Sequence, residues 1–450
     1  MTERTRAFTV THKAVLAIAV PMTVANLSTP LLGLVDTAVI GRLGSAALIG
    51  AVAVGAVFFD FLFGALHFLR IGTVGLTAQA LGARDETEQR AVLIRALLLA
   101  VAAGLLLIAL KGPLTWAAFA FIDASAEVTT AAATYIDLRL WSAPVALANL
   151  VIVGWFLGLG RATTALVLQV LLNGTNVVLN IAFVLGLGWG VWGLALGTVL
   201  AEIVTLMVSL VLAGRMLGWR LDVSRARILD AARLKRLMAV NRDIMIRTLA
   251  LTFAFATFAR AGAQAGDVAL AANAILMNLF LFTAHFLDGA AGAAEQLGGR
   301  SVGARDRAGL RRTLALTNLW GTGTAVVLAL VLLLLGPAIV DLLTTAPAVR
   351  EAAKAFLPWA ALTPLTGTLA FQLDGLYIGA TWTEAMRDMM LIALALYLAL
   401  VWLLSAGGVF DLGNTGLWIA LHAFLLLRGA TLLWLYPRME ARTFASSRPV

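Results

Sequence analysis

Twelve long apolar runs, separated by short polar and charged stretches, dominate the pattern of the 450-residue chain. A helix of about 20 apolar residues crosses the hydrocarbon core of a bilayer, which is roughly 30 Å thick. Each run is long enough to do so, and the pattern therefore predicts an all-α polytopic membrane protein with twelve transmembrane helices. The predicted spans are residues 13–40, 46–70, 92–110, 130–158, 165–187, 193–213, 244–264, 268–295, 313–335, 355–379, 388–408 and 415–436.

The basic residues are distributed unevenly between the two sides of the predicted spans. If the amino terminus is cytoplasmic, most of the 33 Lys and Arg residues fall on the cytoplasmic side, and those left outside are Arg42, Lys111, Arg350 and Lys354. Cytoplasmic loops of membrane proteins carry such an excess of basic residues. We therefore expect both termini in the cytoplasm, together with a basic cytoplasmic linker at residues 214–243. The net charge of +9 is then a signal of topology and does not indicate nucleic-acid binding.

Short motifs recur along the chain at a nearly constant spacing. Gly82-Ala83-Arg84-Asp85 returns as Gly303-Ala304-Arg305-Asp306, and the pair Gly154/Gly158 returns as Gly375/Gly379 at the same interval. The repeat predicts two pseudo-symmetric six-helix bundles. An even number of spans in each gives both the same orientation, which is a parallel repeat about an axis along the membrane normal. The predicted domains are an amino-terminal lobe at residues 1–213 and a carboxy-terminal lobe at residues 244–450.

Composition and missing motifs exclude several classes of protein. The chain is 61% hydrophobic and 13% charged, whereas soluble domains are about 45–50% apolar and about 25% charged. It contains no cysteine, and no lysine follows a glycine as the phosphate-binding Walker A motif requires. The four histidines have no metal-binding spacing, and no nucleophile elbow is present. We therefore expect no enzyme activity, no metal or cofactor and no direct use of ATP. Alternating access by two similar bundles fits better than a channel or a membrane enzyme.

Asp36 is the leading candidate for a functional residue inside a span. An ionisable side chain in the membrane costs about 2.5–3.5 kcal/mol on insertion scales, and it therefore indicates function. Pro21 and Pro30 precede Asp36 in the same span, and a proline in a helix interior removes a hydrogen bond and kinks the helix. A carboxylate beyond such a hinge can couple its protonation to helix bending. The alternative is an aspartate that accepts hydrogen bonds for structure alone.

A second polar cluster, Asn173, Asn176 and Asn180, lies in the predicted span 165–187. Asn176 and Asn180 are four residues apart and share one face of a helix. Their amides can therefore donate hydrogen bonds to a carboxylate or line a polar cavity for substrate. The alternative role is hydrogen bonding between packed helices.

Asp60 and Asp374 are further candidates for cavity lining or substrate contact because both carboxylates lie within predicted spans. Glu202, in the middle of the span 193–213, is a weaker candidate. For all of these acids, an ion pair with Arg428 or another arginine within the membrane is an equally good interpretation.

Three segments resemble transporters of the MATE (multidrug and toxic compound extrusion) family, and in particular its DNA-damage-inducible F subfamily. They are residues 32–44 (LGLVDTAVIGRLG), 75–83 (GLTAQALGA) and 373–380 (LDGLYIGA). The resemblance extends over essentially the whole chain and agrees with the duplicated layout of twelve spans.

The resemblance implies a V-shaped pair of six-helix lobes that exports organic, often cationic, compounds in exchange for H⁺ or Na⁺. It implies that Asp36 is the cation-coupling carboxylate, with Na⁺ as one of the two ions that could bind there, and that bending of the first span switches the site. Relatives often carry an aspartate at the position of Asn180, and its absence shifts the weight to Asp36. We expect a monomer in a bacterial inner membrane, whose partners are small-molecule substrates and the lipid bilayer. The alternative within the superfamily is a flippase for lipid-linked oligosaccharides or polyprenyl lipids.

Overall fold

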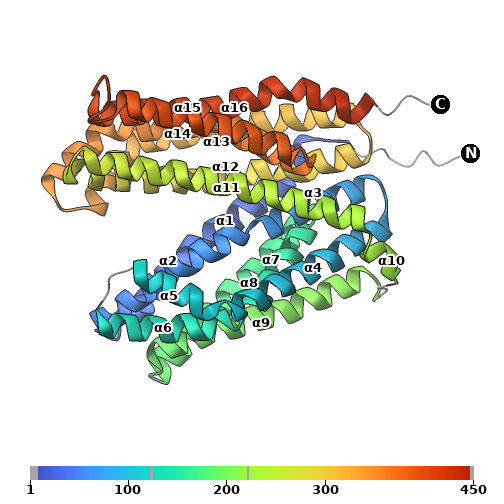
Figure 1. Cartoon of the computed structure of the whole chain (residues 1–450), viewed down its shortest axis with the longest axis horizontal. Coiled ribbons are helices and arrows are strands. Elements are labelled where there is room, and N and C mark those ends of the chain that lie inside the picture. The colour runs from blue at the N-terminus through green and yellow to red at the C-terminus, as the bar shows by residue number, and fades with distance from the viewer. Residues whose placement is uncertain (1–8, 122–124, 220–221, 446–450) are drawn as a thin grey trace, which may run out of the picture. The chain divides into compact units, whose positions relative to one another are not determined.

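The computed structural model describes residues 9–121, 125–219 and 222–445, and within these ranges the chain is helical with no strand (Figure 1). The first half contains α1 (His12–Gly41), α2 (Ala46–Leu66), α3 (Phe68–Gly82), α4 (Glu86–Ala109), α5 (Lys111–Phe121), α6 (Ala126–Leu140), α7 (Ala143–Gly158), α8 (Ala162–Asn180), the π-helix η1 (Ile181–Gly186) and α9 (Gly190–Met216). The rest contains α10 (Arg225–Ile228), α11 (Ala231–Gln264), α12 (Asp267–Gly303), α13 (Arg307–Leu343), α14 (Pro347–Gly379), α15 (Thr383–Leu404) and α16 (Gly413–Ala445).

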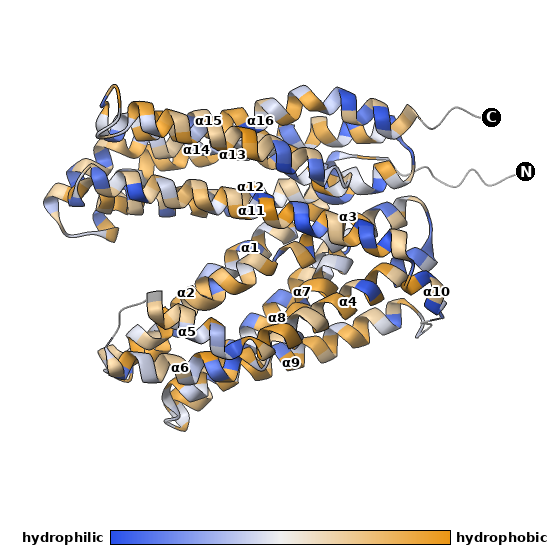
Figure 2. Ribbon diagram, in the orientation of Figure 1, coloured by the Kyte–Doolittle hydropathy of each residue, from blue (hydrophilic) through white to orange (hydrophobic). Residues whose placement is uncertain are grey.

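Most of the helices are long and apolar enough to cross a membrane. Within the described residues ten helices meet this condition, and α6 with α7, bent by 56° at the break between them, make an eleventh. The remaining predicted span, 355–379, lies in α14, a continuous helix of 33 residues that contains Pro358 and Pro364. Figure 2 shows that hydrophobic residues dominate the helices, whereas hydrophilic residues gather in α10 and near the carboxy-terminal end of α16.

The chain forms two compact units. Unit 1 consists of Met1–Thr23, Gly82–Arg84 and Arg242–Val450, and unit 2 consists of Val24–Leu81 and Asp85–Asn241. Helix α1 therefore contributes its first part to unit 1 and its second part to unit 2. The predicted lobe boundaries at residues 213 and 243 stay predictions.

The repeated Gly-Ala-Arg-Asp motif forms the same helix–turn–helix junction in both halves. Arg84 and Arg305 adopt left-handed backbone conformations, with φ of 55° and 54°. The aspartates that follow cap the next helix: Asp85 Oδ1 accepts from the Glu88 backbone N–H at 2.9 Å, and Asp306 Oδ1 accepts from the Gly309 backbone N–H at 2.8 Å. Such caps satisfy backbone donors that a helix start leaves unpaired. The motif is therefore a structural turn in both halves.

The repeated glycine pairs also occupy equivalent positions. A Cβ atom on Gly154 would lie 2.6 Å from the Arg70 backbone oxygen, and one on Gly375 would lie 2.1 Å from the Ala291 backbone oxygen. Only glycine allows α7 to approach α3, and α14 to approach α12, this closely. Together with the shared turn, this packing confirms the predicted duplication of the fold.

The basic linker is held to unit 2 by ion pairs. Arg227 of α10 pairs with Asp85, and both Arg227 and Arg233 pair with Glu88. Glu88 also accepts a hydrogen bond from Arg95 at 2.5 Å. Several cations around one partly buried carboxylate form a network, which holds a segment better than an isolated surface pair does.

The predicted topology can be tested with reporter fusions. Fusions after Arg225 and after Arg438 should both report a cytoplasmic location, because both sites lie in segments rich in Lys and Arg, which are cytoplasmic in most membrane proteins. A fusion near Ala346, which precedes α14, should report the opposite side. A reporter after Arg225 that reads periplasmic would contradict the duplicated twelve-span topology.

Candidate functional site

Asp36 lies on the part of α1 that belongs to unit 2, and an amide of α8 binds it. Asn180 Nδ2 donates to Asp36 Oδ1 at 2.8 Å, and the same nitrogen donates to Asn176 Oδ1 at 2.7 Å. The hydrogen bonds continue to α9, where Asn176 Nδ2 donates to Thr198 Oγ1 at 2.9 Å. A continuous chain of polar side chains therefore joins α1, α8 and α9 through the interior of unit 2.

This chain of hydrogen bonds is buried at one end and open at the other. Asn176 and Asn180 are 1% and 0% exposed, whereas Asp36 is only partly buried. A Cβ atom on Gly197 of α9 would lie 2.2 Å from Asn180 Oδ1, so this glycine makes the room that the amide occupies. Within the described residues, Asn180 Oδ1 is buried without a hydrogen-bond partner. The Asn180 amide therefore turns its nitrogen to Asp36 and its unused acceptor to α9.

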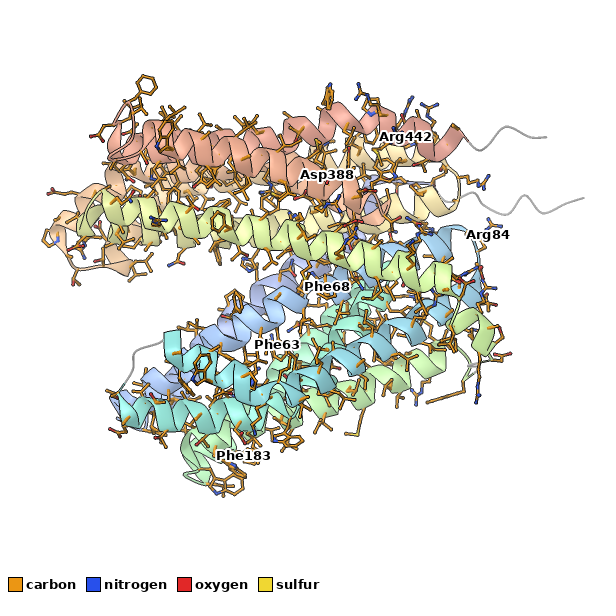
Figure 3. All side chains as sticks on the ribbon, viewed as in Figure 1. Phe63, Phe68, Arg84, Phe183, Asp388 and Arg442 are labelled. Carbon is orange, nitrogen blue, oxygen red and sulfur yellow. The ribbon has the colours of Figure 1, made fainter. Side chains whose placement is uncertain are left out.

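The backbone changes its winding directly after Asn180. The π-helix η1 begins at Ile181, and Leu187 N donates to Ala182 O at 2.9 Å, which is the i→i+5 bond of a π-turn. The segment carries Phe183, whose ring centroid lies 5.1 Å from that of Trp189 (Figure 3). π-Turns are rare and occur frequently at functional sites. Here the π-turn ends the helix that supplies the amide to Asp36.

Asn173 belongs to a separate branch of the network. Its Nδ2 donates to Ser28 Oγ at 2.9 Å and to the Ser28 backbone oxygen at 3.3 Å. Gln169 Nε2 donates to Asn173 Oδ1 at 3.0 Å. Asn173 therefore ties α8 to α1 two turns before Asp36 and close to Pro30. Asn173 and Asn180 thus bond to α1, Asn176 bonds to Asn180 and to α9, and only Asn180 contacts the carboxylate.

The acids of the predicted spans differ in their ionic partners. Asp36 forms no salt bridge within the described residues, although Arg139 interacts with it electrostatically. Asp60 is exposed and likewise has no salt bridge in the described part of the chain. Glu202, by contrast, lies 3.9 Å from Arg139. Asp36 is thus a partly buried carboxylate that is held by an amide and not by a cation.

Asp374 lies in unit 1 between two arginines. Arg428 of α16 donates to Asp374 Oδ2 at 2.6 Å, and Arg247 of α11 also donates to this oxygen. Asp374 is 5% exposed and Arg428 is 3% exposed. The structure therefore gives Asp374 the ion-pair arrangement that was the alternative to substrate contact.

A surface hollow of about 410 Å³ is present in unit 2. It is lined by Ala133, Thr134, Asp137, Leu138 and Trp192. None of the candidate residues that the sequence predicts lines it.

A family model described as MatE matches residues 21–182 and 244–403, one segment in each half of the chain. The chain belongs to the MatE family. It is 40% identical to the DNA damage-inducible protein F of Escherichia coli (strain K12) over 96% of this chain and 93% of that protein. It is 26% identical to Protein DETOXIFICATION 44, chloroplastic, of Arabidopsis thaliana over 95% of this chain and 82% of that protein. A crystal structure described as MATE in the bent conformation has a similar fold, with a TM-score of 0.86 and 20% identity over 97% of each chain.

MatE membership confirms the family resemblance of the three short segments. It also confirms the predicted duplicated helical fold. The chain is a multi-pass membrane protein and a transporter of the multidrug and toxic compound extrusion family. No observation favours the flippase alternative.

Sequence reasoning missed several members of the polar network in this MatE protein. Thr198 and Ser28 each accept a hydrogen bond from an asparagine of α8, and neither hydroxyl stood out among many in apolar spans. One signal was available: Thr198 and Glu202 are four residues apart, and so share a face of α9. A threonine and an acid on one face of a membrane helix indicate that this face makes polar contacts with neighbouring helices.

Proposed function

We propose that this MatE transporter is a cation-coupled antiporter. It exports organic small molecules, cationic or amphipathic in character, in exchange for H⁺ or Na⁺. Asp36 is the coupling carboxylate. Asn173, Asn176, Asn180 and Asp60 are polar groups of the transport pathway in unit 2, and Asp374 supports unit 1 through its ion pairs with Arg428 and Arg247. The observation that carries the proposal is that Asn180 donates a hydrogen bond to the Asp36 carboxylate, which lies within a span and has no salt bridge to any described residue.

Coupling requires that the cation bind one conformation better than the other. A ligand shifts a conformational equilibrium only by its difference in affinity for the two states. Asp36 offers a charge that H⁺ or Na⁺ can neutralise, and the amide chain to Thr198 stabilises the charged form. A cation at Asp36 would therefore change the relative stability of the two arrangements of α1, α8 and α9. The two lobes would then alternate access by rocking.

Both coupling ions remain compatible with this chemistry. A proton needs only the carboxylate, whereas Na⁺ is a hard cation that needs several oxygen ligands. Asp36 would supply carboxylate oxygens, whereas the Asn180 amide as it stands presents its nitrogen to this carboxylate. The gradient that drives transport distinguishes the two ions.

The experiment is substrate efflux from proteoliposomes driven by one gradient at a time. A pH jump without Na⁺ and a Na⁺ jump at constant pH should give different rates, and the coupling ion is the one whose gradient drives transport. Cation release should accompany substrate uptake in the same vesicles. Efflux that responds to neither gradient would contradict cation coupling.

Pro30 offers a test of the proposed hinge in α1. This helix runs from His12 to Gly41 and passes from unit 1 to unit 2 between Thr23 and Val24, so Pro21 and Pro30 flank the transition. Pro30→Ala restores a backbone donor and removes the ring that disrupts the helix. We expect efflux to fall severalfold with normal insertion, because Pro30 is exposed and its loss leaves no cavity. Efflux assays on equal amounts of inserted protein measure this, and a wild-type rate would show that the proline is incidental.

We propose the cytoplasmic membrane of a bacterium as the location, with both termini in the cytoplasm. The basic linker and the basic end of α16 support this orientation through the positive-inside rule. A monomer is expected, with the substrate and the bilayer as its partners.

A further inference from the structure

Arg139 of α6 and Glu202 of α9 form a buried but loose ion pair in unit 2. Their closest atoms, Arg139 Nη2 and Glu202 Oε1, are 3.9 Å apart, and the side chains are 14% and 9% exposed. In the part of the chain that the structure describes, Glu202 Oε2 and Arg139 Nε are both buried without a hydrogen-bond partner. A buried ion pair offsets its desolvation only when its geometry is good and its hydrogen bonds are complete. Stability alone therefore does not explain why these two charges are here.

Arg139 is held in place by contacts that do not involve Glu202. Its Nη1 donates to Tyr135 Oη at 3.0 Å, and its guanidinium carbon lies 4.2 Å from the centre of the Phe59 ring. Gly55 of α2 leaves room for Tyr135, because a Cβ atom there would lie 2.3 Å from the Tyr135 ring. The cation is thus supported by aromatic groups from α2 and α6, and Glu202 is free to change its charge without releasing it.

Acids from three helices share this one arginine. Asp36 of α1 and Asp60 of α2 interact electrostatically with Arg139, and Glu202 of α9 is its ion-pair partner. Among the described residues, Tyr135 on the same helix is a further titratable group that interacts with Arg139. One positive charge therefore balances several negative ones in a poorly solvated region, where charges interact more strongly than in water.

The other helices packed against α9 bring polar but uncharged groups towards this part of unit 2. From α7, Asn149 Nδ2 donates to the Glu202 backbone oxygen at 2.9 Å. From α8, Asn176 bonds Thr198, which precedes Glu202 by one helical turn. Ser142 lies beside the Glu202 carboxylate, and its hydroxyl donates to the Arg139 backbone oxygen at 2.9 Å. The Asp36 amide chain and the Glu202 carboxylate therefore meet on one face of α9.

We propose that Glu202 is a second ionisable switch of unit 2, which together with Arg139 sets the electrostatic potential at Asp36. When Glu202 is charged, it neutralises Arg139, and Asp36 binds its coupling cation tightly. When Glu202 takes up a proton, the charge of Arg139 is uncompensated and favours release of the cation from Asp36. The inference rests on the proposed role of Asp36 as the coupling carboxylate. By linkage, cation binding at Asp36 must favour the charged form of Glu202 to the same degree. Glu202 is thus a positioning residue, because its charge acts on the coupling cation from a distance and does not contact it.

The proposal predicts opposite effects for two neutralising substitutions. Glu202→Gln resembles the protonated acid, and we expect it to weaken the apparent affinity for the coupling cation by about tenfold, within the usual range of coupling between sites. Arg139→Gln removes the opposing charge, and we expect it to strengthen that affinity. In the double variant the two effects should largely cancel, because one positive and one negative charge are removed together. The measurement is substrate efflux from proteoliposomes over a series of pH values without Na⁺, and over a series of Na⁺ concentrations at constant pH.

Two controls separate this inference from structural damage and from the proposed function. Glu127→Gln removes an exposed glutamate at the start of α6 and should leave both series unchanged. Asp36→Asn should lose the cation dependence altogether. If Asp36→Asn keeps wild-type coupling, the proposed function fails. If Asp36→Asn is uncoupled but the efflux of Glu202→Gln depends on pH and on Na⁺ concentration as that of the wild type does, only the present inference is wrong.

The double-mutant comparison supplies the remaining outcomes. A shift in the same direction for Glu202→Gln and Arg139→Gln would overturn the proposal, as would a double variant whose cation dependence departs from that of the wild type as far as either single variant does. Thermal unfolding of each purified variant shows whether it is folded. If Glu202→Gln does not fold, Arg139→Gln decides alone: tighter cation dependence supports the proposal, and an unchanged or weaker one contradicts it.

Discussion

Asp36→Asn should abolish gradient-driven efflux and leave a folded, membrane-inserted protein. Asparagine has nearly the shape of aspartate but cannot bind or release a proton and carries no charge to attract Na⁺. To move a two-state equilibrium almost completely from one side to the other, a ligand must prefer one state by about 10⁴-fold. Without a cation at Asp36, that preference has no source. We therefore expect efflux at the background rate whichever gradient is imposed.

The fold should tolerate this substitution because of how Asp36 is bound. Asn180 Nδ2 donates to its Oδ1 at 2.8 Å, and an asparagine oxygen accepts the same hydrogen bond. The lost charge has no salt-bridge partner within the described residues, so no arginine is left unpaired. A change in stability within about 1 kcal/mol is expected, which is the net worth of a typical hydrogen bond.

The measurement combines efflux from proteoliposomes with substrate binding at several pH values and Na⁺ concentrations. Asp36→Asn should still bind substrate, but its affinity should no longer depend on the cation. Asp137→Asn, which changes a half-exposed aspartate of α6 that pairs with Lys111, is the matched control and should export normally. Cation-dependent export by Asp36→Asn at the wild-type rate would place coupling elsewhere.

Hydrophobic patterning predicts most of this fold because each span carries its own signal. An apolar run of sufficient length is visible without knowing its neighbours, and the repeated motifs reveal the duplication. The details that depend on the backbone are less visible. The break at His67, which divides the predicted span 46–70 into α2 and α3, and the π-turn after Asn180 leave no clear mark in the composition. The short helix α5 follows a predicted span and was not expected.

The candidate site shows where sequence reasoning stops. The spacing of Asn176 and Asn180 predicts a shared helix face and suggests a carboxylate as partner, but which acid they reach depends on how α8 packs against α1. Asn173 looks equivalent in the sequence, yet it bonds Ser28 and not Asp36. The pairing of Arg139 with Glu202 joins α6 to α9 and requires the three-dimensional packing. Pairwise contacts between helices are therefore the part that one sequence does not contain.

Asp374→Asn is expected to damage folding, in contrast to Asp36→Asn. The carboxylate of Asp374 accepts from Arg428 at 2.6 Å and also from Arg247, and it is 5% exposed. Breaking a buried ion pair by removing one partner costs about 3–5 kcal/mol, because the remaining charge is buried without compensation. Here one substitution leaves two such charges. We expect a markedly lower unfolding temperature and a low yield of inserted protein.

The arrangement of the two arginines suggests how the damage can be partly repaired. Arg428 is the more buried of the two, with a side chain 3% exposed against 15% for Arg247. Removing Arg428 together with the carboxylate leaves only the cation that is nearer to solvent. The variant Asp374→Asn with Arg428→Gln should therefore be more stable than Asp374→Asn alone, and the two effects should be clearly non-additive. Asp374→Glu keeps the charge and should be the mildest of the series.

Unfolding temperatures of the purified variants in detergent, together with efflux per inserted molecule, distinguish a structural role from a coupling role. A structural ion pair predicts a fall in stability with little change in the cation dependence of whatever protein remains folded. The opposite pattern, in which Asp374→Asn is as stable as the wild type but exports nothing, would mean that this carboxylate exchanges the coupling cation in spite of its two arginines. If Asp36→Asn were then active, coupling would belong to unit 1. The hydrogen bonds from Asp36 to Thr198 would then serve only to hold packed helices together.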